Sequence, residues 1–123
     1  WAQIDALVLP GGIPGAHHLR ENDFLIQKLK EYSKKGKIIA AICAAPIVLH
    51  RAGLLKKKKF TCYPGFEDEI NDGVYTGALV EKDGKIITGC GAAASFEFAY
   101  TIAEALGTDT SALREGMQYN KLF

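Results

Sequence analysis

A continuous apolar run, Lys37 to Ile42 (K-I-I-A-A-I), is the feature of the sequence that most constrains the fold. Consecutive residues of a strand point to opposite faces, so a strand that is apolar throughout must be covered on both sides, as in the middle of a parallel sheet. Ile4 to Leu9 is a second run of this kind, and Pro10-Gly11-Gly12 ends it. These two runs predict buried parallel strands.

Helical patterns follow the predicted strands. Asn22 can cap a helix with apolar positions at Leu25, Leu29 and Tyr32, and Gly36 stands where this helix should end. Residues 47–52 predict a second helix that stops near Gly53. A third helix is predicted from Ser95 to Gly107, and its expected buried face consists of Phe96, Ala99, Ile102, Ala103 and Leu106.

Weaker signals complete the chain. Residues 60–62 predict a third strand, and residues 64–67 open a short helix. Asp83-Gly84 is favoured in tight turns and lies between two short strand patterns, Leu79 to Glu81 and Lys85 to Thr88, which predicts a hairpin. Alternating strands and helices imply a mostly parallel sheet with helices on both faces. We expect one α/β domain over residues 1–123.

The composition excludes several classes of function. The chain has 123 residues, 48% of them hydrophobic, and a net charge of +1, which gives no basis for binding nucleic acid or an anionic membrane. No apolar stretch is long enough to cross a bilayer. The basic run Lys56 to Lys59 is interpreted as a solvated loop. Three cysteines with no zinc-binding spacing fit free thiols in a reducing cytoplasm, and we predict no metal and no cofactor.

Cys43 stands where the strand Lys37–Ile42 gives way to a helix, and ligand sites of such sheets lie at the carboxyl ends of the strands. A side chain at such an elbow is exposed, and the turn needs small neighbours, here Ala44 and Ala45. The start of the following helix favours the thiolate and can hold an oxyanion. The alternative is a small buried side chain, the common use of a free cysteine.

A base for this thiol is harder to find. His17 and His18 are expected in a loop at the same edge of the sheet, where they are more typical of surface residues than of a catalytic base. His50 is seven residues beyond Cys43, about 10 Å along a helix, which is too far for proton transfer. The sequence therefore shows a nucleophile without an obvious base.

Two further cysteines and an acidic segment can be considered as part of the site. Cys62 and Cys90 are interpreted as small buried side chains, because neither follows a strong apolar strand into a helix. The acidic residues 67–69 follow the third strand and are not expected to face the thiol.

Four linked motifs now point to a family. D-A-L-V-L-P-G-G (5–12), A-A-I-C-A-A-P (40–46), T-C-Y-P-G-F-E (61–67) and S-F-E-F-A (95–99) occur in this order. Their spacing resembles the ThiJ/PfpI superfamily, in the branch of parkinsonism-associated deglycase and its bacterial relatives. The resemblance implies a flavodoxin-like three-layer sandwich with a small β-hairpin, and usually a homodimer.

The resemblance also implies roles for individual residues. Cys43 corresponds to the oxidisable elbow cysteine of the family, with Gly12 and Ala44 as backbone donors around its sulfur. Further candidates to line the pocket are Gly11, Tyr63, Pro64 and His17. The protease-like branch has a histidine where this chain has Ala44, and the human-type members have one where it has Tyr63.

A further departure concerns the start of the chain. Family members have a strand–helix–strand portion before residue 5, and it carries the glutamate that hydrogen-bonds the cysteine. We expect this chain to be the C-terminal part of a longer protein, with a separate N-terminal fragment as an alternative partner. The general base is then expected outside these 123 residues.

The resemblance implies three alternatives for function. The first is a cysteine-dependent glyoxalase or deglycase that acts on 2-oxoaldehydes such as methylglyoxal, or on their early adducts. The second is a non-enzymatic redox sensor or holdase chaperone switched by oxidation of Cys43. The third is an amidase-like or peptidase-like thiol hydrolase, which would need a base that this chain does not display.

Overall fold

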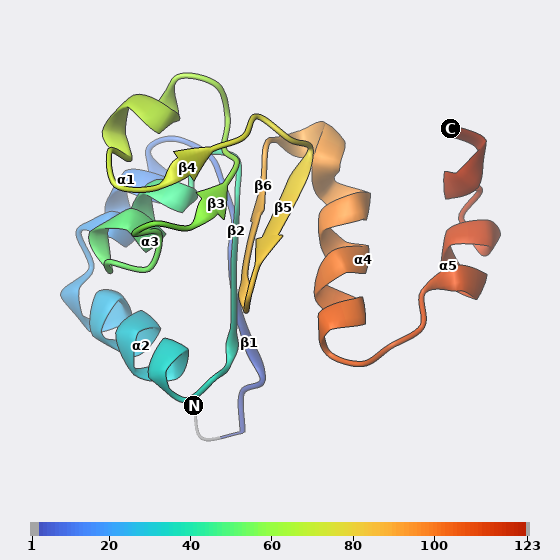
Figure 1. Ribbon diagram of the computed structural model, residues 1–123, viewed down its shortest axis with the longest axis horizontal. Helices are drawn as coiled ribbons and strands as arrows, with labels where there is room; N and C mark the ends of the chain where they lie inside the picture. The colour runs from blue at the N-terminus through green and yellow to red at the C-terminus, as the bar shows by residue number, and fades with distance from the viewer. Residues whose placement is uncertain (1–2, 123) are drawn as a thin grey trace.

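The computed structural model describes residues 3–122, and its centre is a four-stranded sheet in the order β1-β2-β6-β5 (Figure 1). The strands are β1 (Ala6–Leu9), β2 (Ile38–Ile42), β5 (Val80–Asp83) and β6 (Ile86–Gly89). The first three strands of this order are parallel, and β5 is antiparallel to β6. The predicted hairpin is confirmed, and Gly84 supplies its positive φ of 63°.

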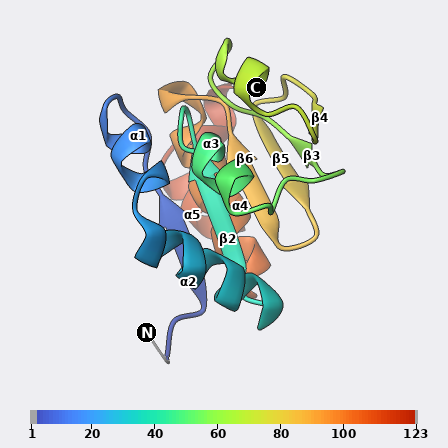
Figure 2. The same ribbon diagram turned by 90° about the vertical axis from the view of Figure 1, so that its left-hand side faces the viewer.

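Helices cover both faces of the sheet, so the predicted three-layer α/β fold is confirmed. On one face, which is turned toward the viewer in Figure 2, lie α1 (Gly15–Arg20), α2 (Asp23–Lys34) and α3 (Pro46–Arg51). On the other face lies α4 (Ser95–Ala105), followed on its outer side by α5 (Ser111–Gly116) and a 3₁₀ turn, η3 (Tyr119–Leu122). No helix in residues 3–122 has the length and apolar character to cross a bilayer.

The helix predicted after Asn22 forms as expected. The Asn22 side chain accepts a hydrogen bond from the Leu25 N–H at 3.1 Å, which satisfies one of the free donors at the start of α2. Leu29 and Tyr32 are buried against the sheet, with Ile26 beside them. A local capping signal and an apolar repeat were therefore enough to define this helix.

The third predicted strand lies outside the main sheet. β3 (Lys59–Phe60) pairs in parallel with β4 (Val74–Tyr75), a strand that the sequence analysis did not predict. The turns η1 (Phe66–Glu69) and η2 (Ala92–Ala94) are 3₁₀ helices. The Thr61 N–H donates to the Thr88 hydroxyl at 2.9 Å, so the chain beyond β3 crosses above the end of β6. Cys62 and Tyr63 are thereby brought to the carboxyl edge of the main sheet.

The predicted buried face of α4 was partly wrong. Phe98 packs with Ile102 and Ala105 against the sheet, whereas Phe96 is 52% exposed and Leu106 is 48% exposed. The helix is apolar on more than one side, so periodicity alone could not identify the side that meets the sheet. His17 and His18 were also misplaced, because they lie in α1 and not in a loop.

Candidate active site

Cys43 follows β2 directly and adopts φ = 65°, in the left-handed region that costs a residue with a side chain about 1–2 kcal/mol. Two hydrogen bonds hold this conformation. The Cys43 N–H donates to the Gly89 carbonyl at 2.9 Å, and the Cys43 carbonyl accepts the Tyr63 N–H at 2.9 Å. A strained backbone that its surroundings maintain at the end of a strand is the geometry of a nucleophile elbow.

Small residues surround the elbow, as predicted. Ala44 and Ala45 are buried, and Pro46 occupies the first turn of α3. Gly11 is in closest contact, since a Cβ placed on it would lie 2.6 Å from the Cys43 Cβ and 3.4 Å from the sulfur. The end of β1 therefore reaches Cys43 only because residue 11 has no side chain.

A pocket of about 260 Å³ opens beside the thiol, which is itself partly exposed. It is lined by Gly11, Gly12, Ile42, Cys43, Ala92 and Ser95. Of these, Ile42, Ala92 and Ser95 were not predicted. Ser95 is the first residue of α4, and its hydroxyl donates to the Ala92 carbonyl at 2.7 Å. Its position in the motif S-F-E-F-A was the signal available in the sequence.

The remaining predicted site residues are not among those that line this pocket. Ala44 is the residue directly after the thiol, and its side chain is buried. Tyr63 holds the Cys43 carbonyl through its backbone, while its ring is 52% exposed and packs near Phe66. Pro64 is exposed, and His17 is half-buried in α1. Their roles in binding or proton transfer stay predictions.

His50 has a different partner. Its Nδ1 lies 3.0 Å from Asp72 Oδ1, and both side chains are about one-third exposed. This pair links the end of α3 to the loop before β4. In the described structure, His50 is thus held away from the elbow, in agreement with the spacing argument.

Cys62 brings a second thiol into the neighbourhood of the elbow. Its side chain is fully buried, and burial raises the pKa of this thiol to about 12. The negative charges of Glu67, Cys43 and Cys90 add to this effect, in that order. The burial predicted for Cys62 is confirmed, whereas Cys90 is only partly buried. Cys62 therefore lies within electrostatic range of both other thiols.

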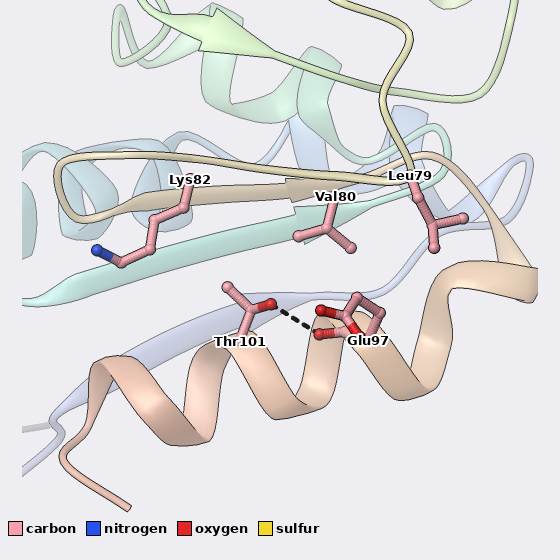
Figure 3. Close-up of a pocket in the computed structure, with 5 residues that line it drawn as sticks. All are labelled: Leu79, Val80, Lys82, Glu97 and Thr101. Atoms are coloured by element: carbon pink, nitrogen blue, oxygen red, sulfur yellow. Dashed lines mark hydrogen bonds between the residues drawn. The ribbon is translucent and has the colours of Figure 1, made fainter. Parts of the chain in front are cut away.

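A larger hollow of about 540 Å³ lies between β5 and α4 (Figure 3). It is lined by Leu79, Val80, Lys82, Glu97 and Thr101. The Glu97 carboxylate accepts hydrogen bonds from Arg114 and Tyr119, which anchor the C-terminal segment. None of the five lining residues is a cysteine, serine or histidine, so the Cys43 pocket is the stronger candidate for chemistry.

A parallel sheet between two helical layers, with a cysteine at positive φ on the edge where its strands end, defines the class of α/β proteins with a nucleophile elbow. The family comparison gives the particular assignment: the chain belongs to the DJ-1/PfpI family, whose sequence model matches residues 1–105. The resemblance deduced from the four motifs is confirmed.

Curated relatives agree with this assignment. The Parkinson disease protein 7 homolog of Danio rerio is 41% identical over 105 residues, which cover 83% of this chain and 56% of that protein. Protein dj-1beta of Drosophila melanogaster is 38% identical over 106 residues, or 85% of this chain and 57% of that protein. The chain thus spans little more than half the length of these relatives.

Solved structures show the same fold. Drosophila melanogaster DJ-1beta superposes with a TM-score of 0.89 at 35% identity, over 94% of this chain and 64% of that one. A DJ-1 superfamily protein from Salmonella typhimurium gives a TM-score of 0.86 at 36% identity, over 98% of this chain and 65% of that one. Toxoplasma gondii DJ-1, in an oxidised form, gives 0.84 at 36% identity, over 95% and 64%.

Proposed function

We propose that the protein is a cysteine-dependent enzyme of the glyoxalase or deglycase type, which acts on 2-oxoaldehydes such as methylglyoxal or on their early adducts. The observation that carries this proposal is the partly exposed thiol of Cys43, held at φ = 65° beside a small pocket. A pocket of about 260 Å³ suits a substrate of few atoms. Membership of the DJ-1/PfpI family supports the proposal.

In the proposed reaction the Cys43 thiolate attacks the aldehyde carbon. A carbon–sulfur bond forms, and the carbonyl π electrons move onto oxygen, which gives a hemithioacetal oxyanion. The backbone N–H groups of Gly12 and Ala44 stabilise this oxyanion. A base then moves the proton from the former aldehyde carbon to the neighbouring carbon, and hydrolysis of the resulting thioester releases lactate and restores the thiol.

The base is the part of this mechanism that the pocket does not supply. None of its six lining residues carries a carboxylate or an imidazole. We assign the role to a glutamate of a preceding segment in the full-length protein. Glu67 is the competing candidate within this chain, because its charge acts on Cys62, and the residue after Cys62, Tyr63, donates its N–H to the Cys43 carbonyl.

Methylglyoxal turnover by the full-length protein tests the proposal. Cys43→Ser should lower kcat/KM by at least about 10³-fold, because a hydroxyl without an activating base is a far poorer nucleophile. Cys90→Ser is the matched control and should keep its activity. Turnover by Cys43→Ser at the wild-type rate would refute the mechanism. Glu67→Gln separates the two bases, since a loss in kcat would place the base within this chain.

A second function, a redox sensor or holdase without turnover, is favoured by the position of Cys43 between the segments that carry Cys62 and Cys90, because Cys43 is hydrogen-bonded to Tyr63 and to Gly89. Mild peroxide treatment followed by a thermal unfolding measurement tests it. A sensor should show a shift in Tm that Cys43→Ser abolishes, while methylglyoxal is not consumed. We also propose a homodimer for the full-length protein, and its mass in solution checks this.

A further inference from the structure

We infer that Cys62 is the resolving thiol for oxidised Cys43, so that peroxide converts the pair into an intramolecular disulfide. The proposal concerns regulation of the same site, but it does not depend on the aldehyde reaction. It rests on how the segments that follow β2, β3 and β6, each of which carries a cysteine, meet at the carboxyl edge of the main sheet.

The backbone of Cys43 is held between the segments that carry the other two cysteines. On one side it donates to Gly89, the residue before Cys90, and on the other it accepts from Tyr63, the residue after Cys62, both at 2.9 Å. Residue 62 therefore lies close to the elbow in space, although it is 19 positions away in the sequence.

The packing around the elbow favours Cys62 over Cys90. Cys62 belongs to the buried core cluster that includes Ala44 and Ala45, the two residues directly after Cys43. Cys90 is partly exposed and is not among the residues of that cluster.

Burial makes Cys62 unreactive until Cys43 is oxidised. It is fully buried, so dissolved peroxide meets Cys43 first. Burial is the main cause of its high pKa of about 12, and the Cys43 thiolate is among the charges that raise it.

The chemistry needs only a peroxide as oxidant. The Cys43 thiolate attacks the peroxide, the O–O bond breaks, and the sulfur keeps one oxygen as sulfenic acid. The Cys62 sulfur then attacks the Cys43 sulfur, and the S–O bond breaks. The leaving hydroxide takes the Cys62 proton and departs as water. Two thiols have lost two hydrogens in total, and the peroxide has been reduced.

Intact mass and peptide mapping of the full-length protein, after one equivalent of hydrogen peroxide, test the inference. The wild-type protein should lose two hydrogens and yield a cross-linked peptide that joins Cys43 to Cys62. Cys90→Ala is the matched control and should behave in the same way. Cys62→Ala should instead gain oxygen on Cys43, because the sulfenic acid then proceeds to sulfinic acid.

Two results would overturn the inference: oxygen added to wild-type Cys43 without a disulfide, or a cross-link from Cys43 to Cys90. If Cys62→Ala does not fold, the wild-type and Cys90→Ala maps still decide between the outcomes. Methylglyoxal turnover is measured on the reduced protein, so a failure of the enzymatic proposal and a failure of this one are observed separately.

Discussion

Gly11→Ala would place a methyl group directly against the elbow. The added Cβ would lie 2.6 Å from the Cys43 Cβ and 3.0 Å from the Ile42 carbonyl oxygen. Both neighbours belong to β2 or to the elbow, so neither can move without shifting the backbone. Gly11 is not in the left-handed region, and the effect is therefore steric and not conformational.

The size of the effect follows from two opposing contributions. Overpacking of a tight site costs about 1–3 kcal/mol. Replacing glycine by alanine at a compatible backbone returns about 0.4–1 kcal/mol, because the unfolded chain loses freedom. We expect Gly11→Ala to lower the free energy of unfolding by about 1–2 kcal/mol. The new methyl group, 3.4 Å from the sulfur, should also slow alkylation of Cys43.

Urea denaturation and the rate of iodoacetamide labelling at Cys43 measure the two effects. Gly15→Ala is the matched control, because a Cβ on Gly15 would have no heavy atom within 4 Å. It opens α1 and should leave both readouts close to wild type. A Gly11→Ala protein with wild-type stability and labelling rate would refute the claim that close packing of β1 shapes the elbow.

Two further predictions concern pH. Folding raises the pKa of Cys62 from 9.0 to about 12, so the contribution of this thiol to stability is complete below pH 9 and is lost as the pH rises toward 12. The free energies of unfolding of wild type and Cys62→Ala, plotted against pH, should therefore converge over this range. Parallel curves would contradict this prediction. Burial opposes ionisation of Glu97, but hydrogen bonds from Arg114 and Tyr119 outweigh it and hold the pKa of this carboxyl below 4.5. The contribution of Glu97 to stability is present above pH 4.5 and is lost as the pH falls below that value. Acid unfolding followed by circular dichroism should therefore depend less steeply on pH in Glu97→Gln than in wild type. The same pH dependence in both proteins would contradict this prediction.

Local signals in the sequence predicted most of the elements. Asn22 and the apolar repeat after it defined α2, Asp83-Gly84 defined the hairpin, and the doubly apolar β2 defined the centre of the sheet. These features depend on neighbours within a few residues, which is why a single sequence reveals them. The family motifs added the identity of the elbow and its glycines.

The predictions failed where a contact is made over a long distance in the sequence. The side of α4 that meets the sheet was partly misjudged, because Phe96 and Phe98 are both large and apolar, and only packing decides between them. β4 was missed because a two-residue strand such as Val74–Tyr75 exists only through its partner β3. Ser95 was not assigned to the pocket, since its position depends on how α4 crosses the sheet.

Cys43 shows where this division lies. Its place after a buried strand, with small residues beyond it, was determined by the sequence alone, because strand ends and turns follow local patterns. Its φ of 65° and its position between the segments of Cys62 and Cys90 were decided by the tertiary structure. The register of β2 against β6 and the path of the chain beyond β3 bring these groups together, and distances across strands are fixed only when the whole sheet assembles.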